Sequence, residues 1–216
     1  MAELVIIRGN SGSGKSSLAG KLQTHYGRGT LLISQDTVRR DMIKEKVEPG
    51  NLSIDLTETL ARFGYEHDLL VLVEGFYETD IYGQMLERLK KIFAPQVFAY
   101  YYDLSFEETV RRHQTRAKQE EFTPADMKRW WKDRDFLGWE EEAFFTDEDS
   151  LEAAFDKICS ALDKKAYNSI IANKKTTHKL RKRSPVPVGC FLLRLLFLFS
   201  IPHKRECKQS LYKGEL

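Results

Sequence analysis

The sequence predicts an α/β fold in which a parallel sheet of about five strands has helices on both faces and carries a helical lid. Short, continuous apolar runs alternate along the chain with longer segments whose apolar residues recur at helical spacing. Strands that are apolar throughout are buried on both faces, which is typical of a parallel sheet covered by crossover helices. The third observation is a glycine-rich turn between the first apolar run and the first helical segment.

This turn, Gly9 to Ser16, fits the Walker A pattern G-x-x-x-x-G-K-[ST] of a phosphate-binding loop (P-loop) at every fixed position. A strand at 4–7 leads into it, and a helix over 17–26 leads out. Glycines let successive N–H groups converge on phosphate oxygens, and the helix N-terminus favours negative charge. We expect Lys15 to act catalytically at the β and γ phosphates of ATP, and the Ser16 hydroxyl to bind Mg²⁺. The alternative is a glycine-rich turn with an incidental lysine. The predicted nucleotide-binding residues of the loop are Gly9, Asn10, Ser11, Gly12, Ser13, Gly14, Lys15, Ser16 and Ser17.

The remaining elements follow in order. Strands are expected at 30–34, 69–73 and 97–102, with a short fifth strand at 144–146, and helices over 38–46, 54–66, 80–92 and 150–162. Two further helices begin at capping sequences, Ser105 with Glu108 and Thr123-Pro124 with Asp126. A lid is expected over about residues 112–137. The expected apolar face of the helix over 54–66 consists of Ile54, Leu56, Leu60, Ala61 and Phe63.

Acidic residues follow three of the predicted strands, at Asp36, Glu74 and Asp103. Ligands of parallel α/β sheets bind beyond the carboxyl ends of the strands. We therefore expect Asp36 to accept the proton of an attacking hydroxyl, and Arg39 to hold an anionic or polar part of that acceptor. The alternative for Asp36 is a plain N-cap of the next helix.

Glu74 ends the most apolar run, where a Walker B acid would lie. It is predicted to contact Mg²⁺ through water or to bind the hydroxyl groups of the acceptor. A buried acid is costly without a partner, so the alternative is a salt bridge that orders the loop 76–80.

A basic cluster precedes the lid hinge and contains Arg111, Arg112, Arg116 and Lys118. An arginine in cis can stabilise the charge that develops during phosphoryl transfer. Arg116 is predicted to be that catalytic residue, with Arg112 on the same helix face contacting the nucleotide. A solvated basic face is the alternative for the others. Of the adjacent Trp130 and Trp131, we expect one in the core and one in the wall of the acceptor pocket.

These residues resemble the small P-loop kinases that phosphorylate hydroxyl groups. Ile33-Ser34-Gln35-Asp36 and Val73-Glu74-Gly75 resemble the uridine kinase pattern, in which the corresponding Asp is the general base. Arg39 departs from that pattern, and the Asp-x-x-Arg spacing is similar to polynucleotide 5'-kinases and zeta-toxin kinases, whose Arg grips a phosphate or another anionic group. The resemblance covers about residues 3–163 and implies a five-stranded parallel sheet of the P-loop kinase type, ATP with Mg²⁺, a mobile lid and in-line transfer.

The function predicted from these features is an ATP-dependent kinase for a small hydroxyl acceptor, a nucleoside first. Polynucleotide 5'-kinases, zeta-toxin-like sugar-nucleotide kinases and non-transferring regulatory ATPases stay open as alternatives. The sequence has no N-K-x-D guanine-recognition motif, which argues against a GTPase. Residues 1–163 hold 21 Lys and Arg against 30 Asp and Glu, a net charge of −9, which argues against binding a nucleic acid backbone.

Residues 164–216 differ from this kinase-like domain, because they hold 13 Lys and Arg against 2 Asp and Glu. They are expected to be a basic, apolar extension, non-native or disordered. As a helix, the apolar run 188–201 would reach about 21 Å, short of a membrane core of about 30 Å, so no transmembrane segment is expected. Attachment to a membrane surface is the alternative. The three cysteines form no C-x-x-C pair and no signal peptide is recognised, which predicts a reducing, cytoplasmic location.

Overall fold

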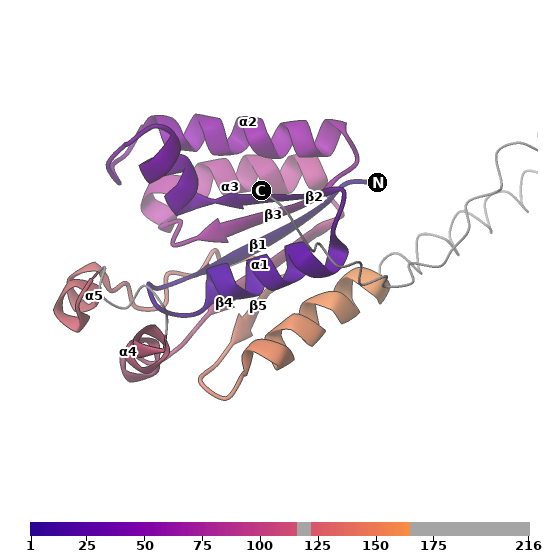
Figure 1. The fold of residues 1–216 in the computed structure, drawn as a ribbon. Helices are drawn as coiled ribbons and strands as arrows, with labels where there is room; N and C mark the ends of the chain where they lie inside the picture. Colours follow the sequence, from indigo (N-terminus) through magenta and orange to yellow (C-terminus); the bar gives the residue numbers. More distant parts are fainter. Residues whose placement is uncertain (116–121, 165–216) are drawn as a thin grey trace, which may run out of the picture. The chain divides into compact units, whose positions relative to one another are not determined.

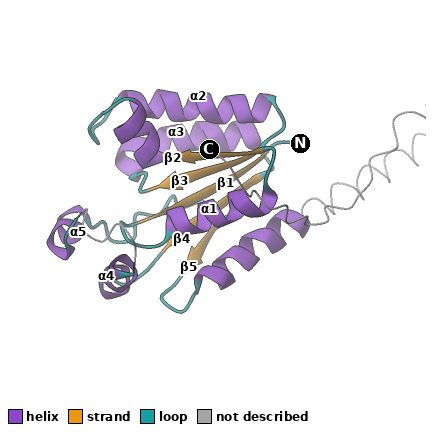
Figure 2. Ribbon diagram, in the orientation of Figure 1, coloured by secondary structure: helices purple, strands orange, loops and turns teal. Residues whose placement is uncertain are grey.

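The structure, a computed structural model, describes residues 1–115 and 122–164. Five parallel strands form one sheet in the order β2-β3-β1-β4-β5 (Figures 1 and 2). The predicted fold class is confirmed. The strands are β1 (Glu3–Gly9), β2 (Thr30–Ser34), β3 (Leu70–Gly75), β4 (Val97–Tyr102) and β5 (Glu142–Phe145).

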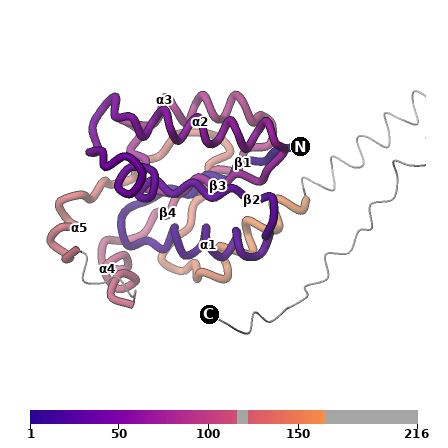
Figure 3. The backbone as a smooth tube through the Cα atoms, turned by 45° about the horizontal axis from the view of Figure 1, so that its top comes forward, coloured from indigo at the N-terminus to yellow at the C-terminus, as the bar shows by residue number. Residues whose placement is uncertain are grey.

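Helices cover both faces of the sheet. One face carries α2 (Leu52–Glu66) and α3 (Thr79–Phe93), and the other carries α1 (Lys15–Tyr26) and a final helix over 151–164. In both views α1 lies on the opposite side of the sheet from α2 and α3 (Figures 1 and 3). The lid helices α4 (Phe106–Gln114) and α5 (Pro124–Trp130) lie beyond the strand ends, near the P-loop. Both begin at the caps expected from the sequence, since Ser105 accepts from the Glu108 N–H and Thr123 forms a capping box with Asp126.

The core has two halves, one on each face of the sheet. Alternate residues of β1 supply them: Leu4 and Ile6 pack toward α2 and α3, whereas Val5 and Ile7 pack toward α1 and the final helix. All four side chains are completely buried. Burial of β1 on both faces explains the continuous apolar run at residues 4–7.

The segment after β2 differs from the expected helix over 38–46. It forms a short π-helix, η1 (Thr37–Met42), that ends four residues earlier than predicted. The Arg39 side chain donates to the Glu45 carbonyl at 3.0 Å, and the Glu45 N–H donates to the Arg39 carbonyl at 2.8 Å, so the chain after η1 is held in a non-helical form. Side-chain contacts of this kind override helix propensity.

The buried face of α2 also differs from the apolar face expected. Ala61 lies in the core and Ile54, Leu56 and Leu60 pack against it as expected, but Phe63 is 51 % exposed. The polar Ser53, Thr57 and Glu58 are buried as well. Glu58 accepts hydrogen bonds from Arg62 on its own helix and from Arg88 on α3. Because the buried carboxylate is paired, a polar position is tolerated where the 3.6-residue period predicts an apolar one.

The predicted boundary after residue 163 lies at the edge of the described residues, and the expectations for 165–216 lie outside them. Within 1–115 and 122–164, no helix is long and apolar enough to cross a membrane.

Candidate active site

The P-loop begins where β1 ends and closes onto α1. Gly9, Gly12 and Gly14 all have positive φ angles, of 140°, 83° and 103°. At Gly12 space adds a second constraint, because a Cβ atom there would lie 2.7 Å from both the Met127 side chain and the Thr109 carbonyl oxygen. The glycines therefore allow both the curl of the loop and its close approach to the lid helices.

Lys15 and Ser16 form the start of α1. The Lys15 ammonium is 8 % exposed at residue level and donates to the Asn10 carbonyl at 2.7 Å and to the Ser13 hydroxyl at 3.3 Å. Gly14 caps α1 without a side chain, so no side-chain cap competes with an anion for the N–H groups of the first turn. Ser17 is exposed on the same turn. The loop fits a triphosphate by its chemistry as well as by its pattern.

The P-loop opens into a cavity of about 860 Å³. Parallel pairing aligns Ser34 with Glu74 and Ile7 with Glu74, which brings the ends of β1, β2 and β3 to one edge of the sheet. The cavity joins residues that are far apart in the sequence: Ser11, Gly12, Lys15, Ser16, Asp36, Arg39, Glu74, Trp130 and Trp131.

Asp36 lies at the start of η1 with 67 % of its side chain exposed. Its carboxylate makes no capping hydrogen bond and instead pairs with Arg39 and Arg40, each at 3.1 Å. Asp36 and Arg39 therefore occur as a bonded pair in the cavity wall, with the rest of the carboxylate open to it.

Glu74 is almost completely buried, and its carboxylate accepts from the Ser16 hydroxyl at 3.2 Å. The two predicted metal-binding side chains thus lie side by side. The loop after Glu74 is ordered by another residue, Gln35, whose side-chain oxygen accepts from the N–H groups of Phe76 and Tyr77 at 2.7 and 3.1 Å.

Arg112 links α4 to the P-loop. Its guanidinium donates to the Ser13 carbonyl at 3.1 Å, to the Asp149 carbonyl at 3.0 Å and to Glu108 at 2.6 Å. Arg111 is exposed and pairs only with Glu108 among the contacts of the described residues. The two arginines lower the pKa of Glu108 to about 2, Arg111 contributing most. Arg116, the predicted catalytic arginine, lies outside the described residues.

Both tryptophans at the end of α5 line the cavity, so the expectation that one of them lies in the core is wrong. The helix ends at Trp130, and Trp131 has an extended backbone with φ −62° and ψ 128°. Adjacent side chains point in different directions on a helix. Because the helix ends between these two residues, both side chains can face the same cavity. The rings instead make edge contacts with Phe122 and Phe106.

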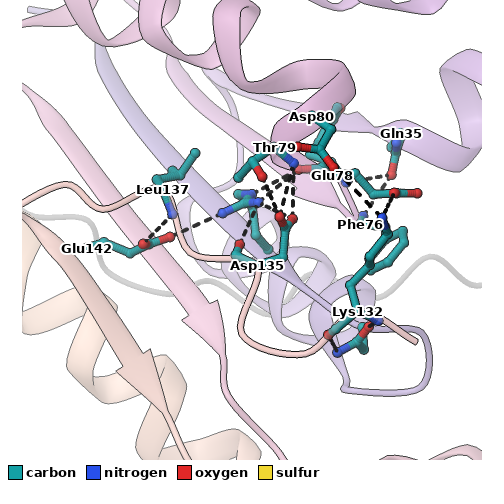
Figure 4. A network of polar contacts seen from close by, with 12 residues as sticks. Gln35, Phe76, Glu78, Thr79, Asp80, Lys132, Asp135, Leu137 and Glu142 are labelled. Carbon is teal, nitrogen blue, oxygen red and sulfur yellow. Dashed lines mark hydrogen bonds and ion pairs between the residues drawn. The ribbon is translucent and has the colours of Figure 1, made fainter. Parts of the chain in front are cut away.

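Sequence reasoning missed a buried ionic network behind the cavity. Arg8 on β1 is fully buried and donates to Asp135 at 2.8 Å, to Glu142 at 3.3 Å and to the Tyr77 carbonyl at 2.9 Å. Asp135 also accepts from the Thr79 N–H at the start of α3, as Figure 4 shows. Burial lowers the pKa of Arg8 and raises that of Glu142, while their mutual attraction opposes both shifts. The only signal for this network in the sequence is Arg8 itself, a charged residue directly after the apolar run 4–7.

Asn10 was predicted to bind nucleotide, but its side chain faces the lid. The amide donates to the Lys132 carbonyl at 2.7 Å and accepts from the Lys132 N–H at 3.0 Å. Lys132 lines the cavity, and its ammonium is 3.2 Å from the Glu78 carboxylate (Figure 4). The P-loop is thereby hydrogen-bonded to the segment after α5, which lies within the range predicted for the lid.

Comparison with known proteins agrees with this architecture. A family model described as an AAA domain matches residues 4–134. No curated protein sequence matches the chain.

Among solved structures, the chain is similar to the Mycobacterium tuberculosis APS kinase CysC in complex with AMPPNP and APS. The TM-score is 0.54 at 16 % identity, over 75 % of this chain and 98 % of that one. A gluconokinase from Sinorhizobium meliloti gives 0.52 at 15 % identity, over 79 % and 97 %. A putative kinase from Chloroflexus aurantiacus gives 0.52 at 17 % identity, over 76 % and 97 %. At these identities the likeness establishes a shared fold.

Proposed function

This chain belongs to the AAA-domain family, and we propose that it is an ATP-dependent kinase that transfers the γ-phosphate to a hydroxyl group of a small molecule, a nucleoside in the first instance. The observation that carries the proposal is one cavity that holds both a P-loop and a strand-end carboxylate, Asp36. A site that only binds nucleotide needs no such carboxylate. Structural neighbours named as kinases support the same reaction class.

The roles of the residues follow from their positions. Residues 9–17 bind the phosphates, with Lys15 at the β and γ positions and Arg112 supporting the loop through Ser13. Asp36 takes the proton of the acceptor hydroxyl as that oxygen bonds to the γ-phosphorus and ADP leaves. Arg39 positions the acceptor. Arg116 remains our candidate for stabilising the charge in transfer.

Ser16 and Glu74 are the residues that would hold Mg²⁺. A hydroxyl and a carboxylate 3.2 Å apart beside the P-loop suit a cation that takes few protein ligands and completes its shell with water and phosphate. When bound, Mg²⁺ neutralises charge on the β and γ phosphates. In the absence of the ion, the Ser16 hydroxyl donates its hydrogen bond to Glu74.

The choice of acceptor separates the alternatives within the kinase class. The uridine kinase-like pattern around Asp36 favours a nucleoside, whereas the Asp36–Arg39 pair favours an acceptor with a phosphate, as in a polynucleotide 5'-kinase or a zeta-toxin-like kinase. We place the reaction in the reducing cytoplasm, because the cysteines form no C-x-x-C pair.

The test is incubation of the protein with ATP, Mg²⁺ and defined acceptors, with phosphorylated products identified by mass. Nucleosides, sugar nucleotides and an oligonucleotide with a free 5'-hydroxyl form separate arms. Phosphorylation of a nucleoside supports the proposal in full. Phosphorylation of a sugar nucleotide or of the oligonucleotide would mean that this compound, and not a nucleoside, is the acceptor. ATP consumption without any phosphorylated acceptor, in these arms or in a metabolite pool, would favour a regulatory ATPase.

A further inference from the structure

Lys132 is the residue from which we draw a further inference, and it rests on the ATP site proposed above. It follows α5 directly, and its backbone is held on both sides by the Asn10 amide, at 2.7 and 3.0 Å. Asn10 is almost fully buried. Two hydrogen bonds to this buried side chain fix both the position and the orientation of the Lys132 backbone beside the P-loop.

Asn10 also marks the end of the P-loop where the γ-phosphate is expected. Its carbonyl accepts from the Lys15 ammonium at 2.7 Å, and a P-loop lysine reaches the β and γ phosphates. The same residue therefore contacts Lys15 through its backbone and Lys132 through its side chain. Asn10 thus links Lys132 directly to the residue that is expected to contact the γ-phosphate, Lys15.

A second anchor keeps this segment in place. Asp135, three residues after Lys132, accepts from the buried Arg8 guanidinium and from the Thr79 N–H. The Asp135 carbonyl also accepts from Arg8 at 2.9 Å, so the backbone is held at both 132 and 135. The Lys132 side chain can therefore change partner without movement of the segment. Figure 4 shows Lys132 and Asp135 on the same stretch of chain, facing the loop that carries Glu78.

The cations that line the cavity differ in how they are engaged. Within the described residues, Arg39 and Arg40 both pair with Asp36, and Arg129 pairs with Asp126 on its own helix. Lys132 pairs with Glu78, another residue that lines the cavity, at 3.2 Å and lies 3.9 Å from Asp80, with 46 % of its side chain exposed. The bond to Glu78 raises the pKa of Lys132, which keeps the ammonium charged.

We propose that Lys132 contacts the γ-phosphate of ATP, and that its ammonium leaves Glu78 for the phosphate oxygens when the triphosphate binds. A flexible lysine suits such an exchange, since it forms no fixed bidentate geometry with either partner. Glu78 holds the side chain in the absence of nucleotide.

Comparison of ATP and ADP tests this contact without any acceptor, because the two ligands differ only in the γ-phosphate. We expect Lys132→Ala to weaken ATP binding about tenfold in calorimetry with Mg²⁺ while leaving ADP binding unchanged. Lys132→Arg should restore most of the preference for ATP. Glu78→Gln should increase it, because the competing carboxylate is lost.

The matched control is Lys128→Ala on α5, whose ammonium lies over the Phe106 ring at 4.6 Å and does not line the cavity. It should leave both affinities unchanged. A wild-type preference for ATP in Lys132→Ala, or equal losses for ATP and ADP, would overturn the contact and leave the proposed function standing. Failure of the wild-type chain to bind ATP would contradict the proposed function itself and the contact with it.

Discussion

At the scale of single residues, the proposed kinase reaction depends most on Asp36. Its carboxylate lies in the cavity, bonded to two arginines on η1 but not committed to a helix cap. A general base contributes about 10²–10⁴-fold to a rate, so Asp36→Asn should lower kcat for phosphoryl transfer by that range. The ATP affinity should stay near the wild-type value, because the P-loop is untouched.

The control for Asp36 is Asp41→Asn, another cavity-lining acid on η1. It removes the same charge from the same element and should reduce kcat far less. Equal effects of the two substitutions would mean that the cavity needs negative charge in general, and unaltered turnover of Asp36→Asn would remove this residue from the mechanism.

At the scale of elements, the buried pair of Arg8 and Asp135 joins β1, the N-terminus of α3 and the segment after α5. Asp135→Ala leaves a buried guanidinium with fewer partners. Breaking a buried ion pair from one side costs about 3–5 kcal/mol, and we expect a loss of that order in the free energy of unfolding, measured with urea. Asp135→Asn should cost less, since its side-chain oxygen still accepts from Arg8 and Thr79.

The exposed neighbour Asp133 provides the comparison, because its side chain lies two residues away on the same segment. Asp133→Ala should be nearly neutral for unfolding. If the two alanine variants unfolded at the same urea concentration, the network would not stabilise the fold as described.

The ion pairs of α4 predict a pH dependence. The hydrogen bond from Arg111 is the largest influence on the pKa of Glu108, and burial, which opposes it, is the second. With the contribution of Arg112, the pKa falls from its ordinary value of 4.5 to about 2. A lowered pKa in the folded state means that the stabilisation is present above the unfolded pKa. It is lost as the pH falls from about 4.5 to about 2.

Urea unfolding of wild-type protein and Glu108→Gln over this pH range measures that effect. The difference in unfolding free energy between the two should be largest near neutral pH and should shrink as the pH falls toward 2. A difference that stays constant across the range would show that Glu108 does not titrate as its two arginine contacts require.

At the scale of the whole molecule, the sequence was sufficient for the sheet and most helices. β1 through β4 follow from apolar runs, and the starts of α4 and α5 follow from Ser105 and Thr123, whose capping chemistry is local. The strand-end rule was also enough to bring Asp36 and Glu74 to one cavity with the P-loop.

What the sequence could not provide depends on partners distant along the chain. Arg8 needs Asp135 and Glu142, and Asn10 needs Lys132, at separations above 120 residues. No periodicity encodes such pairs. The inward-facing Glu58 was hidden for the same reason, since its partner Arg88 lies on another helix.

The same scale includes the C-terminal extension. Within the described residues, the two halves of the core already extend from Ala2 to Leu162. Deletion of residues 167–216 should therefore leave the melting temperature and phosphoryl transfer within error of the full chain. Loss of folding in the shortened protein would show that the segment belongs to the domain.

The central claim is that the γ-phosphate leaves the P-loop for a hydroxyl group. The most direct measurement follows isotope-labelled γ-phosphate from ATP in a metabolite pool, with Lys15→Ala as the variant that should fail to use the triphosphate. We predict that the label appears in a phosphate ester of an acceptor and that Asp36→Asn nearly abolishes this product. Recovery of the label only as inorganic phosphate would contradict the account.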